Sequence, residues 1–170
     1  GKTLQVIALF MQLKLKAEKQ APKAKQTKPC LLIVPTSLLG NWQREVAKFA
    51  PNLRLLVAHR SVNEVQRLSQ VARDPANEVA GYDVVMTTYG MIRKADWLQK
   101  VAWRMVVLDE AQAIKNAASA QTKAIKKIPA ACRITMTGTP VENHLGDLWS
   151  LFDFSSPSLL GSETEFKNFM

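Results

Sequence analysis

The sequence has few cysteines, few glycines and no long hydrophobic run. Its 170 residues include two cysteines and seven glycines, and 47% of them are hydrophobic. Cys30 and Cys132 lie far apart, each next to apolar residues, which argues against a metal site and favours a reducing compartment. No stretch approaches the ~20 apolar residues that span a bilayer, so we expect a soluble protein without a signal peptide. This length favours one domain with one core.

Acidic residues are also scarce, because 14 Asp and Glu stand against 23 Lys and Arg, for a net charge of +9. A basic surface favours nucleic acid, since binding releases condensed counterions. However, the stretch from Lys14 to Lys28 holds six lysines and one acid, Glu18, and so supplies +5 of the +9. Together with Pro22, this composition predicts a solvated linker over residues 14–29. Charge alone therefore gives only modest support for DNA binding.

Short β-branched runs alternate with helical patterns along most of the chain. This alternation is typical of a mostly parallel α/β sheet with helices on both faces. The expected strands are residues 30–34, 53–57, 83–87, 105–108 and 133–136, and the expected helices are residues 38–49, 62–72 and 145–154. Trp42 has the helical spacing of a core residue and is assigned to the core, not to a site. Parallel strands bring their carboxyl ends to one edge, where ligands bind, so the residues that follow each strand are candidates for chemistry.

Two motifs at this expected edge suit nucleotide chemistry. Gly1-Lys2-Thr3 opens an apolar helix and matches the end of a phosphate-binding loop, in which amides and the lysine bind phosphates and the hydroxyl ligates Mg²⁺. Asp109 and Glu110 follow residues 105–108, and such a pair can hold magnesium and accept a proton from water. Each motif also has an ordinary explanation, as a simple helix start or as acids that complement a helix dipole.

Hydroxyl-bearing residues follow three further strands. The three groups are Pro35-Thr36-Ser37, Thr87-Thr88-Tyr89 and Thr137-Gly138-Thr139. Hydroxyls and amides at helix N-termini suit the phosphate oxygens of a nucleic-acid backbone, where they position the protein without reading sequence. Helix capping explains the first two groups equally simply, and a plain turn explains the third.

Taken in order, these segments resemble the motifs of the Swi/Snf family of superfamily-two helicase-like ATPases. The matching segments are GKTLQVIAL, LLIVPTSLLGNWQREVAKFAP, DVVMTTYGMI, VVLDEAQAIKN and ITMTGTPVENHLGDLWSLFDFSSPSLLGS. They cover nearly the whole chain, and the IKN and LWSLFDF blocks distinguish it from DEAD-box RNA helicases. The DEAQ sequence looks like that of bacterial members.

The resemblance implies a RecA-like P-loop lobe over residues 1–154, with the phosphate-loop strand missing before Gly1. Residues 155–170 would begin an extension towards a second RecA-like lobe. The implied function is an ATP-hydrolysing motor on double-stranded DNA, located in the bacterial cytoplasm with the nucleoid and not in a nucleus. We expect the 170 residues alone to be inactive. The alternatives are a non-catalytic interaction module with relic ATPase motifs and a motor subunit of a restriction system, which should lack the IKN and LWSLFDF blocks.

The resemblance also implies a role for each matching residue. Gly1, Lys2 and Thr3 would bind ATP, and Thr3 and Asp109 would hold Mg²⁺. Glu110 would orient or deprotonate the attacking water. Gln112, where many relatives have histidine, would form a hydrogen bond across the cleft. The remaining assignments are the coupling residues Thr137, Gly138 and Thr139, and the DNA-facing residues Pro35, Thr36, Ser37, Thr87, Thr88, Tyr89, Lys115 and Asn116.

Overall fold

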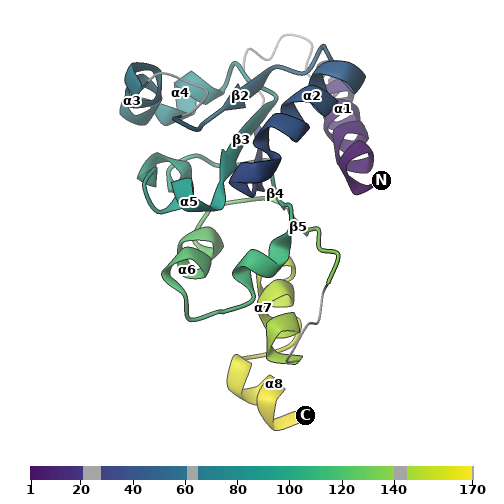
Figure 1. Cartoon of the computed structure of the whole chain (residues 1–170), viewed down its shortest axis with the longest axis vertical. Helices are drawn as coiled ribbons and strands as arrows, with labels where there is room; N and C mark the ends of the chain where they lie inside the picture. Colours follow the sequence, from purple (N-terminus) through teal and green to yellow (C-terminus); the bar gives the residue numbers. More distant parts are fainter. Residues whose placement is uncertain (21–27, 61–64, 140–144, 170) are drawn as a thin grey trace.

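Five parallel strands form one sheet in the order β2-β3-β1-β4-β5 (Figure 1). The computed structural model describes residues 1–20, 28–60, 65–139 and 145–169. The strands are β1 (Cys30–Val34), β2 (Leu55–Val57), β3 (Val84–Thr88), β4 (Met105–Leu108) and β5 (Arg133–Thr135). Every neighbouring pair is parallel. The predicted parallel α/β sheet is confirmed, and each expected strand is present within two residues of its predicted bounds.

Helices cover both faces of this sheet, as predicted (Figure 1). The α-helices are α1 (Lys2–Gln20), α2 (Leu39–Phe49), α3 (Val65–Arg73), α4 (Pro75–Val79), α5 (Tyr89–Ile92), α6 (Ala120–Lys126), α7 (Leu145–Ser155) and α8 (Glu163–Phe169). The described residues also form short 3₁₀ helices: η1 (Thr36–Leu38) after β1, η2 (Asp96–Gln99) between α5 and β4, and η3 (Ala111–Ile114) after β4. Among the described helices, none has the length and apolar character needed to cross a membrane.

The central strand β1 divides the core into two layers. Leu31 and Ile33 pack on the face covered by α3 to α7, whereas Leu32 and Val34 pack against α1 and α2. All four side chains are fully buried. A strand buried on both faces reads as a continuous apolar run instead of an alternating one, because successive side chains point to opposite layers. The layer under α2 contains Trp42, which is 1% exposed.

Helix α1 extends to Gln20, so the linker predicted for residues 14–29 is wrong for residues 14–20. Leu, Lys, Ala and Glu all favour helix, which outweighs the high density of lysine. This end of the helix is also fixed to the sheet. Lys14 Nζ lies 2.9 Å from Asp83 Oδ2, and Arg104 Nη1 donates to the carbonyl of Leu13 at 2.9 Å. Residues 21–27 of the predicted linker lie outside the described residues.

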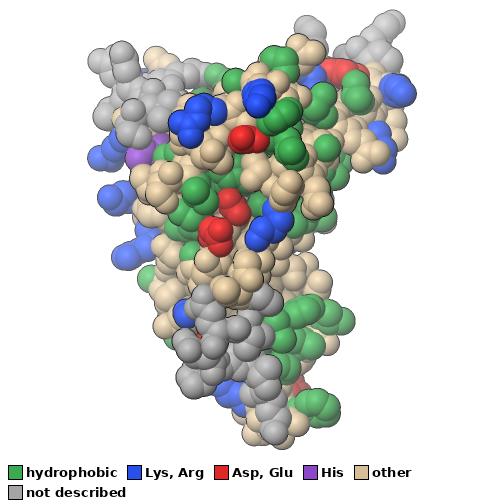
Figure 2. Space-filling model, turned by 45° about the vertical axis from the view of Figure 1, so that its right-hand side comes forward, with side chains coloured by type: hydrophobic (Ala, Val, Ile, Leu, Met, Phe, Trp, Pro, Cys, Tyr) green, Lys and Arg blue, Asp and Glu red, His purple; other side chains and the backbone are tan. Residues whose placement is uncertain are grey.

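The surface charge is mixed on the face shown in Figure 2. Acidic side chains near its centre lie close to basic side chains and to uncharged ones. The net charge of +9 therefore does not form one continuous basic patch on this face. The distribution agrees with the weak support that charge alone gives for DNA binding.

Candidate active site at the carboxyl edge of the sheet

Asp109 directly follows β4 and is 8% exposed. Both oxygens of its carboxylate accept hydrogen bonds. The indole Nε1 of Trp42 donates to Oδ2 at 2.8 Å, and the backbone N–H of Glu110 donates to Oδ1 at 3.0 Å. Since neither donor is charged, these contacts fix the direction of the carboxylate without neutralising its negative charge.

The turn after Asp109 holds Glu110 in a left-handed conformation, with φ 50° and ψ 56°. A non-glycine residue in this region costs about 1–3 kcal/mol and persists only where its surroundings enforce it. Here the hydroxyl of Tyr89 donates to the carbonyl of Asp109 at 2.7 Å, and the N–H of Ala111 donates to the carbonyl of Met136 at 2.8 Å. These contacts from the first residue of α5 and from the residue after β5 enforce the turn, in which Glu110 is half-buried.

A chain of hydrogen bonds connects Glu110 to the end of β5. Gln112 Nε2 donates to Glu110 Oε2 at 2.8 Å, and the hydroxyl of Thr137 donates to Gln112 Oε1 at 3.0 Å. The N–H of Thr139 then donates to the hydroxyl of Thr137 at 3.1 Å. The amide of Gln112 uses its donor on one side and its acceptor on the other, so it connects the acidic residue to the Thr-Gly-Thr turn.

The first turn of α1 lies at the same edge. A Cβ placed on Gly138 would stand 3.9 Å from Lys2 Nζ, so the lysine ammonium reaches the turn after β5. Gly1 and Lys2 are exposed and Thr3 is half-buried. The first turn contains no acidic residue, so its amides present the positive end of the helix dipole to solvent. The structure therefore brings the glycine-lysine-threonine motif and the Thr-Gly-Thr turn together.

The donor set at this edge suits a magnesium ion carried by a nucleotide. Within the described ranges, no three His, Cys, Asp or Glu side chains cluster as a self-contained metal site. Mg²⁺ keeps several waters and is usually bound through one or two carboxylates together with substrate phosphates. Asp109 supplies one ordered carboxylate and Thr3 one hydroxyl, which fits that mode of binding and does not fit a dedicated protein cage.

The residues predicted to face DNA fall into two groups. Thr36, Ser37 and Asn116 are exposed, and Pro35 and Lys115 are half-buried, all after the carboxyl ends of β1 and β4. The side chain of Asn116 accepts a hydrogen bond from the N–H of Ala118 at 3.0 Å. This first group has side chains accessible from solvent.

The second group, Thr87, Thr88 and Tyr89, is buried, with exposures of 0%, 2% and 7%. The hydroxyl of Thr87 donates to the carbonyl of Ala58 at 2.9 Å, and that of Tyr89 donates to Asp109. Burial raises the pKa of Tyr89 well above its usual value, and the nearby charges of Asp109 and Glu110 raise it further. The hydroxyls of Thr87 and Tyr89 therefore serve the protein interior, and the contact of Thr87, Thr88 and Tyr89 with DNA stays a prediction.

The sequence pattern assigned Trp42 to the core and did not predict its contact with Asp109. Its helical spacing is that of a core residue, and it is indeed buried. The available signal was its chemistry, because a buried indole N–H usually finds an acceptor. No sequence pattern identifies Asp109 as that acceptor, since 67 positions separate the two residues.

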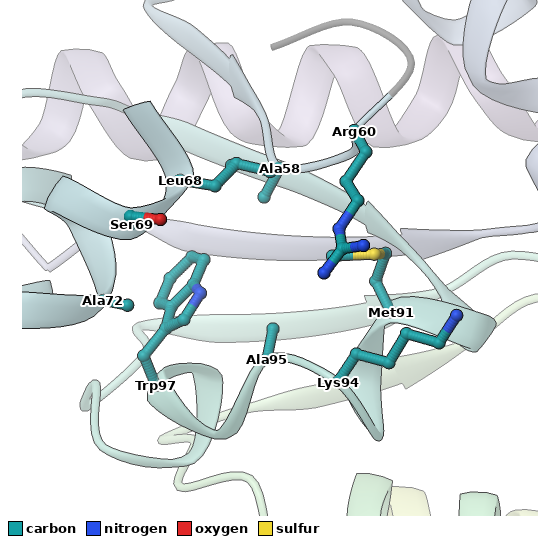
Figure 3. Close-up of a pocket in the computed structure, with 9 residues that line it drawn as sticks. All are labelled: Ala58, Arg60, Leu68, Ser69, Ala72, Met91, Lys94, Ala95 and Trp97. Atoms are coloured by element: carbon teal, nitrogen blue, oxygen red, sulfur yellow. The ribbon is translucent and has the colours of Figure 1, made fainter. Parts of the chain in front are cut away.

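A separate cavity of about 150 Å³ lies beyond the end of β2 (Figure 3). Leu68 and Trp97 line one side, and Arg60 and Lys94 lie on the other. None of the residues predicted to bind nucleotide, magnesium or DNA lines it. The cavity is therefore distinct from the acidic pair and its hydrogen-bonded chain.

Comparisons with known proteins agree with this geometry. The family model described as "SNF2-related domain" matches residues 1–170. The "Putative ATP-dependent helicase/translocase YwqA" of Bacillus subtilis is 41% identical over 167 residues, which are 98% of this chain and 17% of that protein. The "ISWI chromatin-remodeling complex ATPase ISW2" of Saccharomyces cerevisiae is 36% identical over 167 residues, 98% of this chain and 14% of that protein.

Among solved structures, the SWI2/SNF2 ATPase core of Sulfolobus solfataricus in complex with dsDNA matches with a TM-score of 0.77. The two sequences are 41% identical, and the match covers 99% of this chain and 32% of the Sulfolobus chain. The predicted RecA-like fold is thereby confirmed. The chain spans less than a fifth of the two curated relatives and about a third of the matched structure. Because the family model covers every residue, the chain belongs to the SNF2-related domain family, as its five ordered motifs indicate.

Proposed function

We propose that this chain is the first RecA-like lobe of an ATP-driven translocase on double-stranded DNA. The observation that carries the proposal is the hydrogen-bonded chain from Glu110 through Gln112 to Thr137, at an edge that Lys2 also reaches. A half-buried acidic residue connected in this way to a neighbouring strand end can respond to what is bound at either place. The names of relatives support ATP as the substrate, and the matched core in complex with dsDNA supports duplex DNA as the nucleic acid that the protein moves along.

The nucleotide would bind at the first turn of α1. Lys2 and the exposed amides of that turn would bind the phosphates, because both carry positive charge and neither faces an acid within the turn. Thr3 and Asp109 would hold Mg²⁺, which neutralises charge on the phosphate oxygens when it is bound. Glu110 would orient or deprotonate the attacking water through the carboxylate that Gln112 holds in place.

DNA would lie against the exposed side chains that follow β1 and β4. Thr36, Ser37 and Asn116 offer hydroxyl and amide groups, and Lys115 adds a positive charge. Such groups bind phosphate oxygens without reading base sequence, which suits a motor that moves along any duplex. Thr137, Gly138 and Thr139 would couple the nucleotide to DNA, and in support Thr137 donates to Gln112 and Gly138 lies near Lys2.

The chain spans 32% of the matched core, so we also propose that turnover requires a second RecA-like lobe and that these residues alone hydrolyse little ATP. Residues from a second lobe can supply an arginine to the transferred phosphate, a contribution of about 10³ to 10⁵ in rate where it has been measured.

The test is ATP hydrolysis by the full-length protein with duplex DNA, with single-stranded DNA and without DNA. We expect duplex DNA to raise turnover, and we expect the protein to displace a triplex-forming strand from a duplex when ATP is present. A non-hydrolysable ATP analogue should support binding without displacement. Equal turnover with and without duplex DNA would contradict the DNA part of the proposal, and absence of any ATP hydrolysis would contradict all of it.

A further inference from the structure

The hydrogen bond between Trp42 and Asp109 joins a core residue of α2 to the acid that follows β4. Trp42 is 1% exposed, and its Nε1 lies 2.8 Å from Asp109 Oδ2. An indole N–H is a donor and never an acceptor, so Oδ2 must accept. The contact therefore fixes the direction of Oδ2.

The second oxygen of Asp109 is also fixed. Oδ1 accepts the N–H of Glu110 at 3.0 Å, so both oxygens are held and the carboxylate cannot rotate without losing a hydrogen bond. Each carboxylate oxygen can accept about two hydrogen bonds or ligand contacts. One position on each oxygen is therefore occupied, and one remains for a metal ion.

We propose that Trp42 is a positioning residue for magnesium, whose indole N–H orients the Asp109 carboxylate and so sets the affinity for the Mg²⁺-bound nucleotide. The assignment rests on the proposed function, in which Asp109 holds Mg²⁺. Groups that hydrogen-bond a metal ligand typically change metal affinity by about 10- to 100-fold when they are removed. Trp42 does not touch the nucleotide in this scheme and acts only through Asp109.

The chain contains a matched control for this tryptophan. Trp103 is also 1% exposed, and its Nε1 also donates at 2.8 Å, but to the carbonyl of Leu98 on the opposite layer of the core. Replacing either tryptophan by phenylalanine removes the same ring and the same kind of donor. The difference between the two variants therefore isolates the contact with Asp109.

The experiment measures ADP binding to the full-length protein by calorimetry across a Mg²⁺ titration, with ADP in excess EDTA as the metal-free reference. We expect Trp42→Phe to raise the half-saturating Mg²⁺ concentration about tenfold or more. Trp103→Phe should stay within about twofold of the wild type, because its hydrogen bond lies away from the site. The affinity for ADP in EDTA should be the same for all three proteins, since the indole acts through the metal ligand.

A second variant tests the same hydrogen bond in case Trp42→Phe does not fold. Benzothienylalanine at position 42 keeps the two-ring shape and replaces the N–H by sulfur, so it removes the donor with little change in packing. It should raise the Mg²⁺ requirement as Trp42→Phe does. If either position 42 variant binds Mg²⁺ and ADP as Trp103→Phe does, the assignment is overturned and the proposed function is untouched. If the wild type itself shows no Mg²⁺-dependent ADP binding, the proposed function fails and the assignment falls with it.

Discussion

Acidic residues at the two edges of the sheet have different partners. The amino edge is where the parallel strands begin, and the carboxyl edge is where they end. At the amino edge, Asp83 precedes β3 and is paired with two cations, Lys14 Nζ and Arg54 Nη2, each at 2.9 Å. At the carboxyl edge, Asp109 is buried and accepts hydrogen bonds from the neutral indole of Trp42 and a backbone amide. An acid with its own cations is neutralised within the fold. Neutral donors orient the carboxylate of Asp109 without pairing it with a cation.

The pKa of Asp83 reflects this pairing. Burial alone would raise it, but hydrogen bonds from Arg54 and Lys14 and the charge of Arg54 lower it below the usual value for an aspartate. The backbone N–H of Arg54 also donates to Oδ2 at 2.8 Å, so the carboxylate joins β2, β3 and the end of α1. Loss of charge should therefore cost stability at the amino edge and activity at the carboxyl edge.

The largest expected effect is on turnover, at the carboxyl edge. Glu110→Gln keeps the size and the contact with Gln112 and removes only the proton acceptor, so ATP turnover by the full-length protein should fall about 10²- to 10⁴-fold. The free energy of unfolding should change by less than about 0.5 kcal/mol, as for most substitutions outside a core network. Steady-state hydrolysis and urea unfolding measure the two quantities.

The control is Glu163→Gln in α8, an exposed acid whose partner is Lys167 at 2.6 Å on the next turn. An exposed pair of this kind contributes little, so turnover should not change. If Glu110→Gln retained wild-type turnover, Glu110 would not orient or deprotonate the attacking water. The two edges would then differ in their contacts but not in their role in ATP hydrolysis.

The second effect is on stability, at the amino edge. Asp83→Asn removes the charge that binds Lys14 and Arg54, and it should lower the free energy of unfolding by about 1–3 kcal/mol at pH 7. The half-saturating Mg²⁺ concentration for ADP should not change, because Asp83 lies at the other end of the strands. Urea unfolding and calorimetry separate these two results.

The same variant has a defined pH dependence. The pKa of Asp83 is lower in the folded protein than the ordinary value of about 3.9. Its contribution to stability is therefore present above that value and is lost as the pH falls through the folded pKa. The stability difference between wild type and Asp83→Asn should be full at pH 7 and should shrink at acidic pH. A difference that stayed constant down to pH 3 would show that it arises from packing and not from charge.

Much of the carboxyl edge could be predicted from the sequence, and the amino edge could not. The carboxylates of Asp109 and Glu110 follow an apolar strand, and parallel topology then places them at one edge with Thr137. In contrast, Asp83, Arg54 and Lys14 meet only because α1 continues through lysine-rich residues that composition assigned to a linker. Ion pairs between distant positions leave no local pattern in a single sequence.

The direction of the side chains at the carboxyl edge could not be predicted for a similar reason. Strand ends rich in threonine and tyrosine look the same whether their hydroxyls face solvent or the interior. Thr87 and Tyr89 point inward because the carbonyls of Ala58 and Asp109 lie within hydrogen-bonding distance. The sequence predicted which residues reach the edge, but the direction of each side chain depends on neighbours that only the folded chain assembles.

The smallest expected effect concerns the connection between nucleotide and DNA. Thr137→Val keeps the shape of the side chain and removes the hydroxyl that donates to Gln112 and accepts from the N–H of Thr139. Coupling between two sites is typically about 1–3 kcal/mol, so losing one of its hydrogen bonds should reduce the stimulation of ATP turnover by duplex DNA about fivefold. Turnover without DNA should stay near the wild-type rate, because Glu110 keeps its contact with Gln112.

The matched control for Thr137→Val is Thr164→Val on the exposed surface of α8, which should leave both rates unchanged. Steady-state hydrolysis at increasing duplex DNA measures both rates in one titration. An equal loss with and without DNA would place Thr137 in the hydrolysis step itself. In that case the hydrogen bonds from Thr137 to Gln112 and from Gln112 to Glu110 would only position Glu110. Other residues would then couple DNA binding to ATP hydrolysis.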